Sequence, residues 1–330
     1  MTAQRKVWGD TLLELTREDD RVVVLDADLA TSTMAVTVAE GNPEAFIQVG
    51  IAEQNLVGMA FGLSTMGYRP WLSTFGVFLT HRALDQIRML VSQTGAPVRI
   101  AAAYAGLLNG SSGKTHQDIE DLAIMRAMPG MTVLAPADEH EARAITRWAA
   151  EHDGPVYIRY ARDAVAPVFD ADYVFHPGAV HRLRDGGGDV TLVSTGVQSS
   201  RVVEAAELLA ARGVDARVVH VPSLKPVDGD ALLAAISGVG TVVTVEDHSV
   251  INGLGGLVAE LIAERGDPDA PRLHRVGLAD GWSESAPNAF LLDRYGLSAE
   301  RVAEQVLEAL GHSPSPSATV TVTAPGGTVG

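Results

Sequence analysis

The sequence predicts an α/β protein made of two units, each with a parallel β-sheet that is covered by helices on both faces. Short apolar runs alternate along the chain with stretches that have helical spacing. Many of these runs are apolar at consecutive positions, as in strands that are buried on both faces of a parallel sheet. The length of 330 residues also fits two domains of ordinary size.

The second half shows this alternation most clearly. Val202, Ala206 and Leu209 fall on one helical face, and Gly213 follows as a C-terminal glycine. Strands are expected at 190–193, 218–221 and 241–245, with helices around 202–210 and 232–236. A glycine-rich loop at 252–256 then begins another helix. Such a loop either holds a phosphate or lets the helix pack closely on the sheet, and close packing is the more common use.

The first half repeats the pattern. Strands are expected at 22–25, 46–49, 97–103 and 131–134, and a helix rich in Gly and Ala is expected at 56–66. Ligands of parallel sheets bind beyond the carboxyl ends of the strands. Residues able to carry chemistry follow the strands there, namely Asp28, Glu53, Phe75, the 104–116 loop and Asp138.

A change in composition near residues 164–190 marks the boundary between the two units. We expect a first domain at 1–165, a linker at 166–188, a second domain at 189–310 and a disordered tail at 311–330. The tail contains no Asp, Glu, Lys or Arg and consists mainly of Ser, Pro, Thr and Gly, a composition that cannot build a core.

Composition excludes several classes of protein. The net charge of −16 does not favour binding to nucleic acid or to an anionic membrane. The absence of cysteine excludes disulfides and thiolate chemistry, and no apolar run is long enough to span a bilayer. We expect a soluble, cytoplasmic protein. No phosphate-binding P-loop or serine-hydrolase elbow occurs, and no group of His and carboxylate residues has metal-ligand spacing, so no metal ligand is expected.

Glu53 and two phenylalanines are the first candidates for function. Glu53 follows a strand and begins an apolar helix, where a carboxylate can simply favour the helix N-terminus. Phe75 and Phe78 are spaced to lie on one face of a starting helix, and only 5% of the residues are aromatic. The two rings serve either as core filler or as a stacking surface for a ligand.

His116 lies on a polar loop rich in Gly and Ser, where a histidine is either solvated or catalytic. The acids after it, Asp118, Glu120 and Asp121, fit the first turn of a following helix. Arginines 159 and 162 follow a strand and serve either as phosphate ligands or as members of surface ion pairs. His248 also ends a strand, and we interpret it as structural.

Five segments occur in one order along the chain. They are Gly50-Ile-Ala-Glu-Gln-Asn55, the run 73–88 with Phe-Gly-Val-Phe, the run 113–129 with Lys-Thr-His-Gln, Pro136-Ala-Asp138, and the run 245–256. Together they resemble the thiamine-diphosphate enzymes of the transketolase family, and specifically the C-terminal part found in two-subunit transketolases. The similarity spans roughly residues 5–310. It implies a pyrimidine-binding domain that is followed by a smaller transketolase C-terminal domain.

The resemblance also implies roles for cofactor-binding residues. Glu53 is expected to hydrogen-bond the pyrimidine ring of thiamine diphosphate and to favour the imino form that takes the proton from the thiazolium ring. Phe78, with Phe75 nearby, is expected to stack on the pyrimidine. Asp28 is expected near the thiazolium, and Arg82 lies in the stacking segment beside the cofactor.

Substrate contacts are implied for Ser32, Tyr104, Ser112, Lys114, His116, Arg159 and Arg162. His116 is expected to assist proton transfer on the substrate, while Ser32 and Arg159 match positions that hold the sugar phosphate, with Arg162 as a companion. Ser112 replaces a common acid, Tyr104 a common His, and Lys114 a small residue or Pro. These departures favour an unusual acceptor, because polar contacts discriminate strongly between substrates.

The Gly-Asp-Gly motif that holds the cofactor's diphosphate through Mg²⁺ in this enzyme class does not occur in the chain. We therefore expect an N-terminal transketolase subunit to carry the diphosphate-binding domain and the Mg²⁺ ligands, in an α2β2 assembly that acts on a sugar phosphate donor.

Two other functions stay open. One is a thiamine enzyme that acts on a 2-keto acid, similar to 1-deoxyxylulose-5-phosphate synthase or to a 2-oxo acid dehydrogenase beta subunit. The other is a regulatory or scaffold subunit, although such a subunit would have no need of Glu53 and His116.

Overall fold

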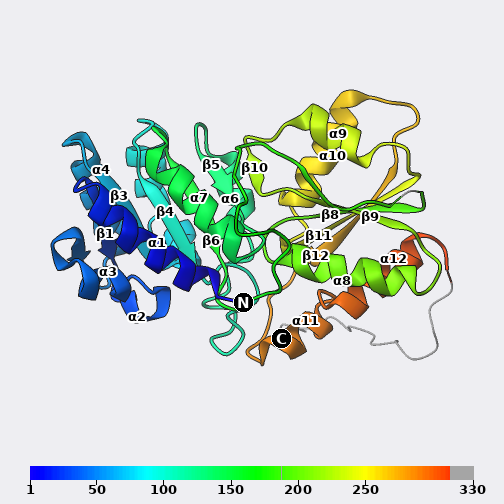
Figure 1. The fold of residues 1–330 in the computed structure, drawn as a ribbon, viewed down its shortest axis with the longest axis horizontal. Helices are drawn as coiled ribbons and strands as arrows, with labels where there is room; N and C mark the ends of the chain where they lie inside the picture. The colour runs from blue at the N-terminus through cyan, green and yellow to red at the C-terminus, as the bar shows by residue number, and fades with distance from the viewer. Residues whose placement is uncertain (187, 313–330) are drawn as a thin grey trace, which may run out of the picture.

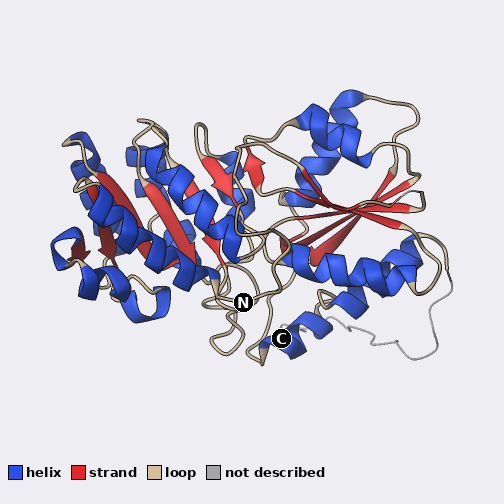
Figure 2. Cartoon of the chain, in the orientation of Figure 1, coloured by secondary structure: helices blue, strands red, loops and turns tan. Residues whose placement is uncertain are grey.

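The computed structural model describes residues 1–186 and 188–312, which form two α/β units side by side (Figure 1). Within these residues the first unit is built on a sheet of seven strands and the second on a sheet of five. Helices cover both faces of each sheet (Figure 2). The predicted fold class is therefore confirmed.

The first sheet has the strand order β10-β5-β6-β4-β3-β1-β2. Its strands are β1 (Val22–Asp26), β2 (Phe46–Gln48), β3 (Arg69–Phe75), β4 (Arg99–Ala103), β5 (Thr132–Leu134), β6 (Val156–Tyr160) and β10 (Ser223–Lys225). All neighbouring pairs are parallel except β10 with β5, which is antiparallel. Strand β10 comes from the second half of the chain, so the two units share a sheet edge.

The helices of the first unit form two layers. They are α1 (Gln4–Glu18), α2 (Ala30–Thr33), α3 (Val36–Gly41), α4 (Glu53–Thr65), α5 (Leu84–Gln86), α6 (Asp121–Ala127) and α7 (Glu139–Glu151), with the short turns η1 (Pro43–Ala45), η2 (Phe78–Arg82) and η3 (Ile87–Ser92). Helices α1 and α7 pack together over one face, around Trp8, Leu12 and Trp71. Helix α4 and the η turns cover the other face through residues such as Leu56 and Leu79.

The second sheet has the order β12-β11-β8-β9-β7. Its strands are β7 (His181–Arg184), β8 (Val190–Ser194), β9 (Ala216–His220), β11 (Thr241–Ser249) and β12 (Arg272–Leu278), and its helices are α8 (Gln198–Ala210), α9 (Gly229–Ile236), α10 (Leu254–Arg265), α11 (Asn288–Arg294) and α12 (Ala299–Ala309). Strand β7 lies in the segment expected to be a linker and pairs antiparallel with β9. Most of the expected tail, from 313 onward, lies outside the described residues.

The glycine-rich loop before α10 serves close packing. The backbone N–H groups of Leu254 and Gly255 donate to the buried Glu246 carboxylate at 2.7 and 2.8 Å. A Cβ at Gly253 would lie 2.0 Å from Glu246 Oε2. Because this carboxylate occupies the N-terminus of α10, a phosphate has no place there. Among the described residues, no helix combines the length and the apolar character that a bilayer crossing requires.

A buried polar chain joins the two units. Glu141 on α7 pairs with His220 on β9 at 2.8 Å, and the other ring nitrogen of His220 lies 2.7 Å from Ser199 Oγ on α8. Tyr173 Oη donates to Glu141 Oε1 at 2.7 Å. Glu141, His220 and Ser199 are all fully buried, so this Ser-His-Glu arrangement positions the units and has no access to a substrate.

Glu141→Gln should make the unfolding free energy less dependent on pH in the acid range. Burial alone acts to raise the pKa of Glu141, but His220 and the hydrogen bonds from Ala137 and Tyr173 hold it below its ordinary value of 4.5. Glu141 therefore adds stability above pH 4.5, and this contribution disappears as the pH falls through the lowered folded-state pKa. Denaturant titrations across this pH range should show that the unfolding free energy falls less steeply with decreasing pH in Glu141→Gln than in the exposed control Glu264→Gln. Parallel pH profiles for the wild type and Glu141→Gln would contradict the prediction.

Candidate active site

A cavity of about 350 Å³ opens at the carboxyl ends of the first sheet's central strands. The wall carries five of the predicted site residues and four small or apolar neighbours: Ala27, Asp28, Leu29, Ile51, Glu53, Phe78, Arg82, Thr115 and His116. The fold thus brings together side chains from the β1 end, the start of α4, η2 and the polar loop after β4.

Glu53 is the first residue of α4 and is 2% exposed. Arg82, on η2, donates from Nη1 to Glu53 Oε1 at 2.7 Å. The Arg82 side chain is 48% exposed, so it reaches the buried carboxylate from the solvent side. The arrangement holds one acidic group at a fixed position in the cavity wall with its charge paired.

Two rings, those of Phe78 and His116, line the cavity with Glu53, while Phe75 and Tyr104 pack next to them outside the lining. The rings of Phe75 and Phe78 stack with their centroids 5.8 Å apart, and Phe75 packs on Tyr104 at 4.5 Å. The His116 ring meets both phenylalanines edge-on, at 6.0 and 5.4 Å. The guanidinium carbon of Arg82 lies 4.4 Å from the centre of the Phe78 ring. A flat ligand entering the cavity therefore meets Phe78, while Phe75 supports Phe78 from behind.

The prediction that Phe75 and Phe78 share one helix face is wrong. Phe75 ends β3, and Phe78 begins η2. The sequence analysis did not predict β3, because Pro70 and the polar pair Ser73 and Thr74 interrupt its apolar pattern. These polar residues are nevertheless buried, and Ser73 Oγ donates to Asp26 Oδ2 at 3.0 Å.

Asp28 and His116 both line the cavity. Asp28 has a left-handed backbone (φ +63°), and its N–H donates to Gln48 Oε1 at 2.9 Å. The same Gln48 side chain donates to the buried Asp26, whose pKa burial raises. His116 is half-buried, and its Nδ1 lies 2.8 Å from Thr115 Oγ1. Both groups are thus positioned by neighbouring polar contacts.

A second group of polar residues lies on the far side of Phe75. Arg5 Nη1 donates to the Ser32 carbonyl at 2.6 Å and to Tyr104 Oη at 2.7 Å, and Arg5 Nε donates to the Arg162 carbonyl at 3.3 Å. The guanidinium carbons of Arg5 and Arg162 lie 5.3 and 5.4 Å from the Tyr104 ring centre. Three predicted substrate residues, Ser32, Tyr104 and Arg162, are therefore neighbours.

Arg5 was missed by the sequence analysis, which did not predict α1. The spacing of Trp8, Leu12 and Leu15 is the signal that marks this helix, since these buried residues recur every three or four positions.

Arg159 does not join this group. Its side chain is buried, its Nε donates to Asp121 Oδ2 at 2.9 Å, and Nη2 donates to the Asp118 carbonyl at 3.2 Å. Asp121 also accepts a hydrogen bond from Tyr157 Oη at 2.7 Å. The expected phosphate ligand is therefore corrected to a structural ion pair, because Arg159 is buried and its charge is paired with the buried Asp121.

The neighbouring acids also differ from expectation. Of these acids only Asp121 lies in α6, and it is fully buried. Its main role is to pair with Arg159, more than to favour the helix N-terminus. Asp118 precedes the helix and accepts from Thr80 Oγ1 at 2.7 Å. His248 is buried and accepts from the Ala123 N–H at 3.3 Å, in agreement with a structural role.

Ser112 and Lys114 lie on the exposed part of the His116 loop. Ser112 Oγ donates to Asn109 Oδ1 at 3.1 Å, and Asn109 in turn donates to the His116 carbonyl at 3.3 Å. Neither Ser112 nor Lys114 lines the cavity, although Thr115 and His116 do. Ser112 thus contributes to the conformation of the loop that carries His116, through its hydrogen bond to Asn109. Lys114 lies away from the residues that line the cavity.

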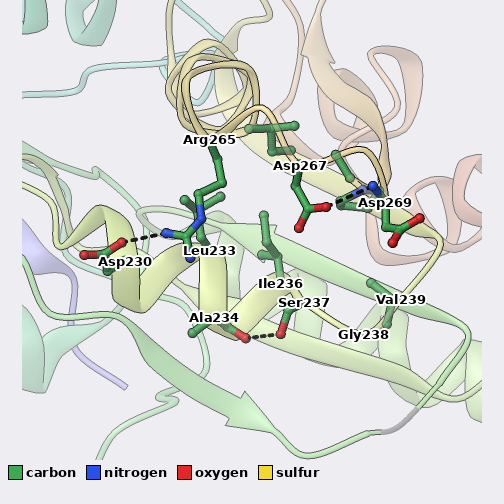
Figure 3. A pocket seen from close by; sticks show the side chains of 13 residues that line it. Asp230, Leu233, Ala234, Ile236, Ser237, Gly238, Val239, Arg265, Asp267 and Asp269 are labelled. Atoms are coloured by element: carbon green, nitrogen blue, oxygen red, sulfur yellow. Dashed lines mark hydrogen bonds and ion pairs between the residues drawn. The ribbon is translucent and has the colours of Figure 1, made fainter.

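A larger cavity, of about 860 Å³, lies in the second unit between α9 and the end of α10 (Figure 3). Its one cationic side chain, Arg265, is paired with Asp230 at 2.9 Å, and Asp267 and Asp269 add further negative charge. None of its 13 lining residues is aromatic or a histidine. It therefore lacks both a stacking surface and a group suited to proton transfer near neutral pH.

Known protein families match both parts of the chain. Residues 1–167 match the model of the transketolase pyrimidine-binding domain, and residues 178–302 match that of the transketolase C-terminal domain. The chain belongs to the transketolase family. It contains the pyrimidine-binding and C-terminal domains of the family over nearly its whole length.

Similar proteins include separate transketolase subunits. The chain is 40% identical to a putative transketolase C-terminal section of Methanocaldococcus jannaschii, over 92% of this chain and 95% of the relative. It is 38% identical to a 6-deoxy-6-sulfo-D-fructose transketolase subunit of a Clostridium species, over 92% and 94%. A solved split-gene transketolase, described as an inactive β4 tetramer, is 45% identical with a TM-score of 0.86, over 94% and 99%.

The chain also resembles part of longer proteins. It is 35% identical to a 1-deoxy-D-xylulose-5-phosphate synthase of Geobacter sulfurreducens, but it spans only 49% of that protein. The transketolase family implies thiamine diphosphate as cofactor. The cavity fits its pyrimidine end, because the Phe78 ring offers a stacking face beside the buried acid Glu53.

Proposed function

We propose that this chain is the C-terminal subunit of a transketolase-type enzyme that moves a two-carbon ketol unit from a ketose phosphate to an acceptor. The observation that carries the proposal is the common cavity of Glu53, Phe78 and His116 in a chain made of these two family domains. Relatives named as separate transketolase subunits match almost their whole length to this chain.

Each side chain of the cavity has a task in this chemistry. When bound, thiamine diphosphate supplies the nucleophilic carbon that attacks the donor ketose. Glu53 lies where its carboxyl group can share a proton with a pyrimidine nitrogen, and Arg82 fixes that carboxyl. Phe78 holds the pyrimidine plane by stacking. His116, across the cavity, is positioned to exchange protons with substrate oxygen atoms, and Asp28 contributes a carboxylate near the same space.

The group around Tyr104 is suited to the terminal anion of the substrate. Arg5 and Arg162 approach the Tyr104 ring, and Tyr104 packs on Phe75, whose ring stacks on Phe78 in the cavity wall. Two guanidinium groups offer the charge-assisted donors that a phosphate or a sulfonate requires. In this proposal Arg5 and Arg162 hold the anion with Ser32, and Arg159 supports the site from the core.

The acceptor is proposed to differ from an ordinary aldose phosphate. The side chains that depart from the family pattern are Tyr104 at the anion group and Ser112 and Lys114 on the His116 loop. A change from acid to hydroxyl and a new ammonium group alter which polar groups an acceptor can pair with.

The missing part of the active site points to a partner subunit. Among the cavity residues only Arg82 is a cation, and its charge is paired with Glu53, so the cofactor's diphosphate needs ligands from another chain. The rim of the cavity and the outer face of α4 expose Ile51 (73%), Met59 (36%) and Met66 (74%). Open space lies around Gly58 on the same helix, which leaves room for a closely packed helix. We propose that the diphosphate subunit, with its Mg²⁺ ligands, covers this face in an α2β2 assembly.

Reconstitution tests this function. The purified chain should show no turnover alone, as fits the relative described as an inactive β4 tetramer. With a candidate diphosphate subunit, Mg²⁺ and thiamine diphosphate, it should cleave xylulose 5-phosphate and should cleave unphosphorylated xylulose much more slowly. Transfer of the ketol unit by the single chain would overturn the subunit proposal, and equal rates with the two donors would overturn the anion site.

The 2-keto acid reaction is the second candidate, and the 35% identity to a 1-deoxyxylulose-5-phosphate synthase is the observation that favours it. Its test is pyruvate as donor in the same reconstituted complex. Carbon dioxide released from pyruvate, without cleavage of xylulose 5-phosphate, would replace the ketol-transfer proposal. A complex that assembles and binds the cofactor but uses neither donor would favour the regulatory or scaffold role.

A further inference from the structure

Three potential metal ligands from two separate segments of the sequence come together in the fold. His81 lies on η2, and Asp118 and Glu120 lie just before α6. One donor atom from each residue lies within 4.8 Å of the donor atoms of the other two. Their separation along the chain explains why residue spacing gave no sign of this group.

The distance between His81 and Glu120 suits a shared metal ion. His81 Nε2 and Glu120 Oε1 are 3.4 Å apart. A good N–H···O hydrogen bond measures about 2.7–3.2 Å, so this contact is longer than one. Two donors that bind Zn²⁺ at about 2.0–2.2 Å in tetrahedral geometry lie roughly 3.3–3.6 Å from each other. The observed distance falls in that range.

Asp118 gives an independent sign that a ligand is missing. Its carboxylate is fully buried; Oδ2 accepts from Thr80, but Oδ1 has no hydrogen-bond partner among the described residues. A buried acceptor without a partner is costly, and a cation would remove that cost.

We propose that His81, Asp118 and Glu120 bind a divalent transition-metal ion of the Zn²⁺ type, with water in the remaining position. One imidazole and two carboxylates are donors that Zn²⁺ accepts. The His81 side chain is 44% exposed and Glu120 is 27% exposed, so an ion can enter from solvent. The site is separate from the Mg²⁺ site expected in the partner subunit. Binding would join η2, which carries Phe78 and Arg82, to the segment that follows His116.

The test is equilibrium dialysis of the full chain against Zn²⁺, with bound metal measured by elemental analysis. The wild type should bind one Zn²⁺ per chain at this site. His81→Ala and Glu120→Gln should each weaken that binding at least tenfold, while the control His140→Ala, next to Glu139 on another helix, should not. Because His81 is near the surface, His81→Ala is expected to keep the wild-type unfolding midpoint.

Binding of Co²⁺ provides a second readout, since a tetrahedral site gives strong visible absorption that His81→Ala should remove. Absence of Zn²⁺ binding, or equal affinity in the wild type and both ligand variants, would overturn the proposal and leave the His81–Glu120 contact as an ion pair. None of these measurements uses activity or the partner subunit, so the result is independent of the proposed ketol transfer.

Discussion

Glu53→Gln should lower the kcat of the assembled enzyme by about 10²–10⁴-fold, the usual contribution of a positioned acid or base. The change removes only the acidic group, because glutamine has nearly the same shape. The amide oxygen of Gln can still accept from Arg82, which holds Oε1 at 2.7 Å, so the fold of the cavity wall should be kept. What is lost is the proton that the buried carboxyl shares with the pyrimidine ring.

Steady-state kinetics of the reconstituted complex, together with cofactor titration, measure this effect. The matched control is Glu44→Gln, the same change on the exposed η1 turn of the same unit. We expect Glu44→Gln to retain full activity and Glu53→Gln to retain its partner and its unfolding midpoint. Unchanged kcat in Glu53→Gln would contradict the role of Glu53 in the proposed function, and a loss that follows from failed assembly would appear in the sedimentation profile.

Arg159→Met should have the largest effect on stability, a loss of about 3–5 kcal/mol in unfolding free energy. Arg159 is buried and pairs with Asp121, which has no exposed surface. Methionine fills much of the same volume but leaves the buried Asp121 carboxylate without its guanidinium partner, with Tyr157 Oη as its hydrogen-bond donor and His248 Nε2 4.0 Å away. Most of the lost unfolding free energy arises because the buried Asp121 carboxylate has no guanidinium partner, and less arises from lost packing.

Denaturant unfolding of the chain alone measures this loss. Arg265→Met is the matched control, because Arg265 forms an exposed pair with Asp230 whose contribution should stay below about 1 kcal/mol. A double variant, Arg159→Met with Asp121→Asn, should recover part of the loss by removing the stranded charge. If Arg159 instead served as a phosphate ligand, Arg159→Met would unfold like the wild type and raise only the KM for the donor.

The sequence predicted the architecture well where apolar runs were continuous. The strands of the second sheet from 190 to 245 were found because each is almost wholly buried and is rich in β-branched apolar residues. Strand β3 was missed because its buried positions include Thr74 and Ser73, and the Ser73 hydroxyl bonds to Asp26 and to Thr33 on α2. The edge strands β7 and β10 are short and half polar, so their sequences resemble loops.

The site residues that lie within recognisable sequence motifs could be predicted from the sequence. Glu53, Phe78, Arg82 and His116 lie in recognisable segments, and the fold places all four around one cavity. Contacts between remote segments were not predictable. The burial of Arg159 could not be inferred from its place near the end of β6, since its partner Asp121 comes from a separate helix. Arg5 was missed for the same reason, because its contacts with Ser32, Tyr104 and Arg162 join segments that are far apart in the sequence.

Strand β10 affects how the chain can be divided. It leaves the second unit, pairs with β5 at the edge of the first sheet and returns, while one continuous apolar cluster includes Leu56 from the first unit and Leu232 from the second. A cut in the peptide between the units would leave each half with an open flank, because the first sheet would lose its edge strand and the cluster would lose one of its sides. We therefore expect the two halves to unfold as one cooperative body, and a protease that nicks the joining segment should not release a folded fragment.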